Sequence, residues 1–141
     1  MKDILNARIK RREAFRPFAP SILEEYTGEY FECAYPDPFM IKVYPVREDK
    51  RTVIPAVTHV DGSGRLQTVS KSTNPRYWQL IEAFRAITGV PVVLNTSFNE
   101  NEPIVCSPDE AIETFLRTKM DLLVMGNTML ARVEPRRGDG Q

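Results

Sequence analysis

The chain has 141 residues, a length that favours one domain with enough interior for a hydrophobic core. Hydrophobic residues make up 42% and charged residues 27%, which is ordinary globular usage and excludes a disordered or fibrous class. Lysine plus arginine number 19, as do aspartate plus glutamate, so the composition argues against a surface built mainly for nucleic acid or an anionic membrane.

Prolines limit the first predicted element. Residues 3–13 favour a short helix, and Pro17 and Pro20 require residues 15–21 to be extended or turning. No apolar run approaches the roughly 20 residues that span a bilayer, and the N-terminus lacks the apolar core of a secretory signal. We therefore expect a cytoplasmic protein without a membrane partner.

The next elements are predicted to be strands. In residues 38–46, Met40, Lys42 and Tyr44 alternate with Ile41 and Val43, and residues 52–60 are rich in β-branched side chains. The DGSG of residues 61–64 predicts a hairpin turn between residues 52–60 and a strand in residues 65–70.

A helix with clear end signals follows. Asn74 is predicted to cap it, Pro75 to occupy its first position and Gly89 to end it. Residues 90–95, VPVVLN, then form a buried strand. Helix and strand together predict a helix packed on a sheet.

The last elements are a second helix and two strands. Ser107 and Glu110 form a capping box at the start of residues 107–120. Residues 121–126 and 128–134 favour short strands around Gly126 and Asn127. The pattern predicts an α+β or mixed α/β domain over residues 1–133, with a flexible tail at 134–141, and we expect the α+β class.

Basic residues gather near the N-terminus, at Lys10, Arg11, Arg12 and Arg16. Arg12 and Arg16 share a face if this segment is helical, and Lys10 and Arg12 point the same way if it is extended. Guanidinium and ammonium groups bind phosphate, so the segment suits anion capture. A solvated basic face is the alternative.

Two further polar groups are candidates. His59, Asp61, Arg65 and Gln67 surround the predicted turn, where Asp61 also suits the turn itself and His59 a structural hydrogen bond. The strand ending at Leu94 is followed by small polar residues that suit either a turn or a ligand-facing loop. These are Asn95, Thr96, Ser97 and Asn99. Cys33 and Cys106 lack the spacing of a disulfide framework or a zinc site, and we expect no metal centre.

Several motifs resemble one family. FRPFAPS, HVDG followed by Arg65 and Gln67, GVPVVLNTSFNENEPIVCSPDEAI and DLLVMGN occur in this order. They resemble the C-terminal domain of the ATP-dependent O-carbamoyltransferases of nodulation and antibiotic tailoring, over about residues 4–132. The resemblance implies a YrdC-like fold, a twisted mixed sheet packed by a few helices. YrdC-like domains carry K-x-R and S-x-N motifs at the nucleotide site, and Lys10-Arg11-Arg12 and Ser97-Phe98-Asn99 fit both.

The resemblance also implies a reaction. Carbamoyl phosphate and ATP, with Mg²⁺, would give carbamoyl-adenylate, pyrophosphate and phosphate, and the carbamoyl group would pass to a hydroxyl acceptor. Lys10 and Arg12 would hold the triphosphate or the carbamoyl phosphate, and Arg16 and Arg65 the leaving phosphate charge. Ser97 and Asn99 would orient phosphate or ribose. The residues implied in catalysis are Lys10, Arg12 and Arg65.

In the family, transfer to the acceptor takes place in a larger, metal-dependent N-terminal domain, to which nothing in these 141 residues corresponds. We expect that domain as a partner, in cis or in trans, and the chain as either a fragment or a stand-alone relative. The alternatives are a non-catalytic binding module and an RNA-binding YrdC-like domain. The even charge balance argues against nucleic acid as the main partner.

Overall fold

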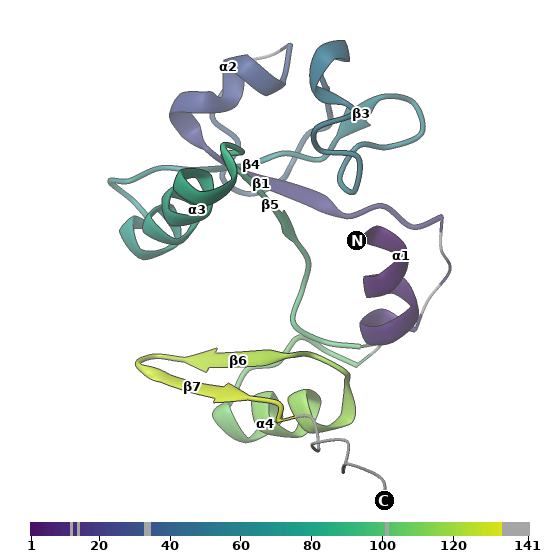
Figure 1. Cartoon of the computed structure of the whole chain (residues 1–141), viewed down its shortest axis with the longest axis vertical. Helices are drawn as coiled ribbons and strands as arrows, with labels where there is room; N and C mark the ends of the chain where they lie inside the picture. Colours follow the sequence, from purple (N-terminus) through teal and green to yellow (C-terminus); the bar gives the residue numbers. More distant parts are fainter. Residues whose placement is uncertain (12, 14, 33–34, 101, 134–141) are drawn as a thin grey trace, which may run out of the picture. The chain divides into compact units, whose positions relative to one another are not determined.

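The computed structural model describes the whole chain apart from residues 12, 14, 33–34, 101 and 134–141. Its elements, shown in Figure 1, are α1 (Lys2–Leu5), η1 (Asn6–Lys10), β1 (Ala19–Leu23), η2 (Glu24–Tyr26), α2 (Thr27–Tyr30), β2 (Tyr44–Pro45), η3 (Glu48–Lys50), β3 (Ser63–Gly64), β4 (Gln67–Val69), α3 (Pro75–Thr88), β5 (Val92–Asn95), α4 (Pro108–Arg117), β6 (Leu122–Met125) and β7 (Thr128–Ala131). Helices and small sheets of mixed and antiparallel strands confirm the predicted α+β class.

The chain divides into two compact units. Unit 1 comprises residues 1–2 and 15–96, and unit 2 comprises residues 3–14 and 97–141. The expected domain of residues 1–133 remains a prediction, and the expected tail lies outside the described residues. No helix in the described part of the chain is long and apolar enough to cross a membrane.

Unit 1 is built on a three-stranded sheet in the order β4-β1-β5. β1 is parallel to β4 and antiparallel to β5, so Ser21 lies opposite Gln67, and Ala19 opposite Asn95. Helix α3 lies beside β1 and β5 (Figure 1). The core between them contains Leu23, Val69 and Ile81, with Tyr26, Tyr77, Trp78 and Val93 around it.

The end signals of α3 and the strand after it are confirmed. The Tyr77 N–H donates to Asn74 Oδ1 over 3.4 Å, and Pro75 occupies the first helical position. Gly89 ends the helix with a φ of 76°, a left-handed value that favours glycine. β5 then covers most of the predicted VPVVLN strand, but within β5 only Val92 is buried, and the three residues after it are partly exposed.

Two strands predicted in unit 1 are largely wrong. Within residues 38–46, only Tyr44–Pro45 form a strand, which is β2. The chain before it is not extended, because Met40 has a φ of 55° and the Asp37 carboxylate accepts two backbone N–H groups from the residues that follow. Residues 52–60 form turns in which the Val53 and Ile54 N–H groups donate to the Lys50 carbonyl. Local hydrogen bonds thus replace the expected extended chain.

The predicted hairpin across residues 61–64 is also wrong, although the turn itself forms. Gly62 has a φ of 82°, and the Asp61 carboxylate accepts from the Ser63 N–H over 3.0 Å. No strand forms in residues 52–60. β3 lies within residues 61–64 and pairs with β2, whereas β4, which follows the turn, pairs with β1 in the other sheet.

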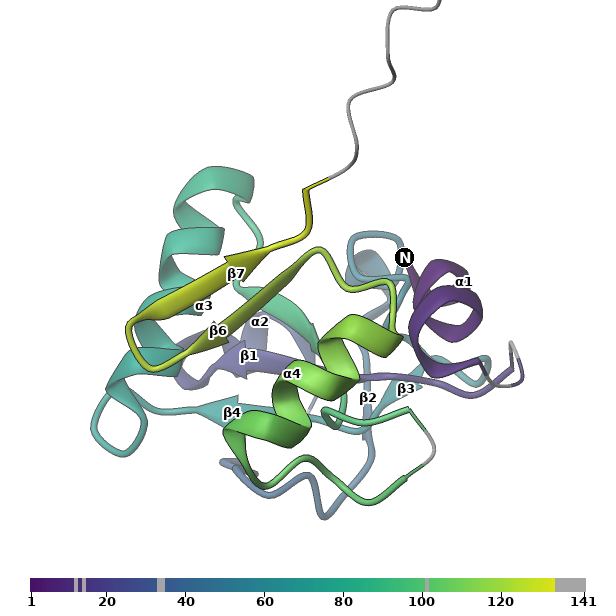
Figure 2. The ribbon, with the colours of Figure 1, turned by 90° about the horizontal axis from the view of Figure 1, so that it is seen from below.

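Unit 2 contains α4 and the β6–β7 hairpin, which lie side by side in Figures 1 and 2. The predicted capping box is present, with Glu110 N–H donating to Ser107 Oγ over 3.3 Å and Ser107 N–H donating to the Glu110 carboxylate over 3.2 Å. Ala111, Phe115 and Leu123 form the core. The two predicted C-terminal strands are confirmed as an antiparallel hairpin that turns at Gly126.

The predicted N-terminal helix is confirmed over Lys2–Lys10, where α1 continues into the π-helical segment η1. It ends at Arg11, whose φ of 43° is left-handed and whose N–H donates to the Asn6 carbonyl. Ile9 and Lys10 of this helix are buried. The helix therefore presents a charged side chain to the interior of the protein.

Candidate functional site

Lys10 is a buried lysine, with 2% of its surface exposed, and it holds a polar loop that lies 87 residues further along the chain. Its Nζ donates to the Ser97 carbonyl over 2.5 Å and to the Asn99 carbonyl over 2.7 Å. Asn99 Oδ1 lies 2.9 Å and Ser97 Oγ 3.3 Å from the same nitrogen. These oxygens offset the cost of burying the ammonium charge.

The spacing of Ser97 and Asn99 has a structural reason. Phe98, between them, packs against the core of α4 and β6, and its carbonyl accepts from the Val105 N–H over 3.0 Å. Ser97 and Asn99, on either side of Phe98, contact Lys10 instead of the core. Ser97 Oγ also donates to Asn99 Oδ1 over 2.6 Å, and Asn99 Nδ2 donates to the Glu102 carbonyl over 2.6 Å. The S-x-N pattern thus combines an apolar anchor with two polar ligands of the lysine.

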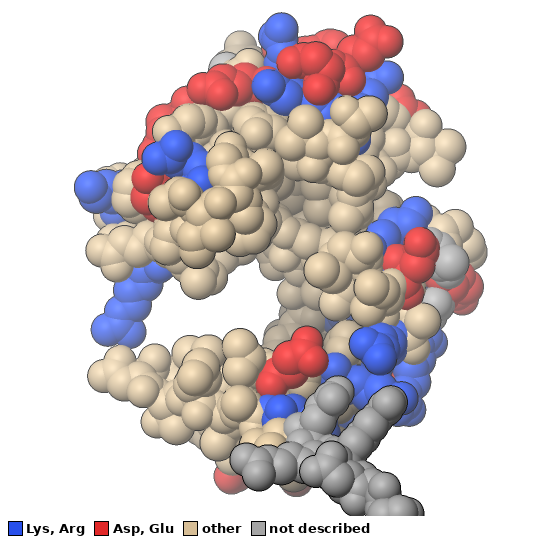
Figure 3. Space-filling view, viewed as in Figure 1, with Lys and Arg blue, Asp and Glu red and all other residues tan. Residues whose placement is uncertain are grey.

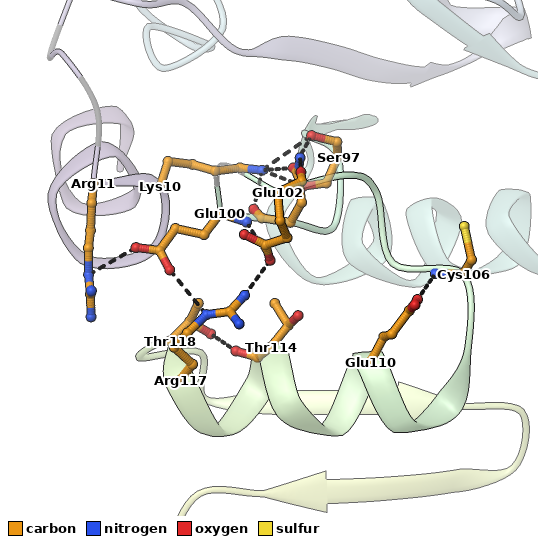
Figure 4. Close-up of polar contacts among 11 residues, drawn as sticks. Lys10, Arg11, Ser97, Glu100, Glu102, Cys106, Glu110, Thr114, Arg117 and Thr118 are labelled. Carbon is orange, nitrogen blue, oxygen red and sulfur yellow. Dashed lines mark hydrogen bonds and ion pairs between the residues drawn. The ribbon is translucent and has the colours of Figure 1, made fainter.

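Ion pairs surround this polar loop, which comprises residues 97–100 and 102 (Figure 4). The Glu100 carboxylate lies between two arginines, 3.2 Å from Arg11 Nε and 3.3 Å from Arg117 Nε. Arg117 also pairs with Glu102, whose carboxylate accepts from the Glu100 N–H over 3.2 Å. The loop is therefore tied both to the N-terminal helix and to α4.

Glu100 should contribute measurably to the stability of unit 2. Its side chain is 10% exposed, whereas those of Arg11 and Arg117 are about half exposed. We expect Glu100→Gln to lower the free energy of unfolding by about 1 to 2 kcal/mol, and less at high salt. Urea titrations at two salt concentrations measure this effect. The matched control is Glu113→Gln on the exposed face of α4; equal losses in both variants would contradict the assigned role of Glu100.

His59 and Asp61 form part of the turn in unit 1. Ser63 Oγ donates to Asp61 Oδ1 over 2.6 Å and lies 3.2 Å from His59 Nδ1. Burial lowers the pKa of His59. The Asp61 carboxylate acts to raise this pKa, and the Arg65 cation acts to lower it further. Hydrogen bonds from Ser63 hold the pKa of Asp61 below its usual value. The imidazole and the carboxylate thus share one serine, and both residues line a surface hollow of about 410 Å³.

The predicted arginines fall in different parts of the chain. Arg16 and Arg65 are exposed and belong to unit 1. Arg12 lies outside the described residues. On the face shown in Figure 3, basic side chains are interspersed with acidic ones, which agrees with the even charge balance of the sequence.

Gln67 and Asn95 meet in unit 1, where Asn95 Nδ2 donates to Gln67 Oε1 over 2.7 Å. Thr96 is exposed and ends unit 1. The structure therefore brings together two sets of predicted residues, Lys10 with Ser97 and Asn99, and Gln67 with Asn95. The pairing of all these residues in one site remains a prediction.

Sequence reasoning assigned no role to Glu100, Glu102 or Arg117. The two glutamates have a signal in the sequence, because they alternate with asparagine directly after the S-x-N motif. Arg117 has none, since an arginine in the last turn of a helix is common for local electrostatic reasons. Its pairing with the polar loop arises from the tertiary fold.

The fold and the lysine-held loop define an α+β domain with a polar, partly buried candidate site. The sequence matches the family model described as carbamoyltransferase C-terminus over residues 1–132, and the chain belongs to this family. The resemblance inferred from the motifs is confirmed.

The chain is also similar to several curated proteins. It is 56% identical over 137 residues to nodulation protein NolNO of Sinorhizobium fredii, covering 93% of this chain and 20% of the relative. It is 55% identical over 140 residues to nodulation protein NolO of Bradyrhizobium diazoefficiens, covering 95% and 25%. An uncharacterized protein of Synechocystis, sll1178, is 45% identical over 163 residues, covering 100% and 26%. The chain thus spans about a fifth to a quarter of the length of these relatives.

Proposed function

We propose that this chain is the nucleotide and carbamoyl phosphate binding domain of an O-carbamoyltransferase. It forms carbamoyl-adenylate: water releases phosphate from carbamoyl phosphate, and the resulting carbamate attacks the α-phosphate of ATP and displaces pyrophosphate. A larger N-terminal domain, in cis or in trans, transfers the carbamoyl group to a hydroxyl acceptor. The observation that carries the proposal is the contact of Lys10 with Ser97 and Asn99, which joins the two short motifs across the chain. Membership of the carbamoyltransferase family supports it.

The proposed chemistry is positioning and charge neutralisation. Adenylate formation spreads negative charge over phosphate oxygens, and fixed cationic groups stabilise that charge. Lys10 and Arg12 are proposed to act on the triphosphate or the carbamoyl phosphate, and Arg16 and Arg65 on the leaving phosphate. Ser97 and Asn99, held by Lys10, would orient phosphate or ribose.

Magnesium is proposed to accompany ATP. This ion commonly binds through substrate phosphates with one or two carboxylates, and it neutralises part of the phosphate charge. In the part of the chain that the structure describes, no group of three histidine, cysteine, aspartate or glutamate side chains is placed to hold a metal.

Binding and turnover assays on the same protein test the proposal. We expect calorimetry to detect both a non-hydrolysable ATP analogue and carbamoyl phosphate, and pyrophosphate release from ATP to depend on carbamoyl phosphate. Nucleotide binding without pyrophosphate release would favour a non-catalytic module. Affinity for duplex RNA with a steep salt dependence, in place of nucleotide binding, would favour the RNA-binding alternative.

Arg65 should contribute to ligand binding and little to folding, because its side chain is exposed. We expect Arg65→Gln to weaken carbamoyl phosphate or ATP binding by about 1 to 2 kcal/mol, a typical loss for a charge-assisted hydrogen bond. Calorimetry on the folded variant measures this change. Arg76→Gln, at an exposed position of α3, is the matched control. Unchanged affinity in the Arg65 variant would remove Arg65 from the proposed site.

A further inference from the structure

Two side-chain amides meet across the sheet of unit 1. Gln67 in β4 and Asn95 in β5 lie on either side of β1. Gln67 Oε1 accepts from Ser21 Oγ over 2.6 Å and from Asn95 Nδ2 over 2.7 Å. Ser21 is completely buried, whereas both amides are half-buried. The orientation of the pair is therefore set from within the sheet, and both side chains remain partly accessible.

A loop closes on this pair from one side. Gln67 Nε2 donates to the Pro38 carbonyl over 3.2 Å, and the Met40 sulfur lies 3.9 Å from Asn95 Nδ2. Met40 has a left-handed φ of 55°, which is costly for a residue other than glycine. The buried Asp37 carboxylate holds this conformation by accepting the Ile41 and Lys42 N–H groups. The fold thus maintains a strained backbone to keep Met40 and Pro38 beside the amides.

The pair retains one acceptor and one donor. Asn95 Oδ1 accepts no hydrogen bond from the described residues, and Gln67 Nε2 uses one of its two hydrogens on Pro38. In Asn99, Oδ1 already accepts from Lys10 and Ser97, whereas the nitrogen keeps one of its two hydrogens after donating to the Glu102 carbonyl. Asn99 can therefore still donate to a ligand, but Gln67 and Asn95 together offer both a donor and an acceptor.

A carbamoyl group presents the complementary pattern, a carbonyl oxygen beside an NH₂ group. We propose that Gln67 and Asn95 form the subsite that recognises the carbamoyl group of carbamoyl phosphate. Gln67 Nε2 donates to the carbamoyl oxygen, and Asn95 Oδ1 accepts from the carbamoyl nitrogen. This inference rests on the proposed function and adds the residues that separate carbamoyl phosphate from other acyl phosphates.

Acetyl phosphate provides the test, because a methyl group replaces the NH₂ group of carbamoyl phosphate. We expect the wild-type chain to bind carbamoyl phosphate about tenfold more tightly than acetyl phosphate, since a site built for a hydrogen bond rejects a ligand that leaves it unpaired. In Gln67→Met this preference should fall below about twofold, while affinity for inorganic phosphate stays the same. Asn95→Leu, measured in parallel, should lose the preference too.

Gln79→Met, at an exposed position of α3, is the matched control and should keep the wild-type preference. Thermal unfolding identifies variants that are folded at the assay temperature, and Asn95→Leu serves if Gln67→Met is not. Equal wild-type affinity for the two acyl phosphates, together with carbamoyl phosphate-dependent pyrophosphate release, would overturn this inference and leave the proposed function in place. If ATP affinity fell in both variants while the preference for carbamoyl phosphate stayed intact, the two amides would contact the adenine base of ATP. This result would also overturn the inference. Absence of binding to ATP and both acyl phosphates would overturn both proposals.

Discussion

Replacement of Lys10 by methionine is expected to lower the free energy of unfolding by about 2 to 3 kcal/mol and to weaken ATP binding at least tenfold. Methionine keeps much of the side-chain length but leaves the carbonyl groups of Ser97 and Asn99 without their shared donor. The polar loop then loses the contact that fixes the S-x-N motif. Urea unfolding and calorimetry with an ATP analogue measure the two effects.

The control separates this role from a general loss of positive charge. Lys119→Met removes a lysine from an exposed position in the same unit and should change stability by less than about 0.5 kcal/mol. Lys10→Arg keeps the charge but replaces a compact ammonium with a planar fork, so we expect it to restore little of either property. Wild-type ATP affinity in a folded Lys10→Met variant would rule out the proposed part of Lys10 in binding.

Replacement of Asp37 by alanine is expected to cost about 3 kcal/mol of stability. The side chain is 5% exposed, and its two carboxylate oxygens accept from Ile41 N–H over 3.1 Å and from Lys42 N–H over 3.0 Å. Loss of the carboxylate leaves these donors unpaired and removes the support of the left-handed Met40. Thermal or urea unfolding measures the loss. Asp121→Ala, at an exposed position, is the control, and comparable effects would contradict the argument.

The same carboxylate should make stability depend on pH. Burial raises the pKa of Asp37, but the backbone N–H groups of Ile41, Lys42 and Phe39 and the Tyr44 hydroxyl outweigh it, so the pKa lies below its usual value. A lowered pKa in the folded state means that the contribution is complete above the unfolded pKa of about 3.9 and is lost as pH falls through the folded value. The acid-dependent loss of stability should therefore be smaller in Asp37→Ala than in the wild type. Parallel pH profiles of the two proteins would disprove this.

Local signals predicted the helices well, because the interactions that define their ends lie within a few residues. The Asn74 cap, the Gly89 stop and the Ser107–Glu110 capping box each depend on side chains next to the backbone groups they satisfy. The β6–β7 hairpin is similar, since Gly126 lies between two short apolar segments.

Strand prediction failed where a local hydrogen bond, to a side-chain carboxylate or to a backbone carbonyl, competed with the extended chain. In residues 38–46 the competing group is the Asp37 carboxylate, and in residues 52–60 it is the Lys50 carbonyl. β-Branched residues favour strands but do not reveal which donors a neighbouring acceptor will take. Local sequence signals do not predict the pairing of β1 with β4 and β5 either, because this pairing joins segments far apart in the chain.

The sequence by itself determined the family, the α+β class and the identity of the polar motifs, since these depend on residue types in order along the chain. The tertiary structure decided which motifs meet. It placed Lys10 against Ser97 and Asn99, added the Glu100–Arg117 ion pair, and brought Gln67 beside Asn95. The physical reason is that a buried ammonium and a half-buried amide take the nearest oxygens and nitrogens that packing provides, and packing depends on the whole chain.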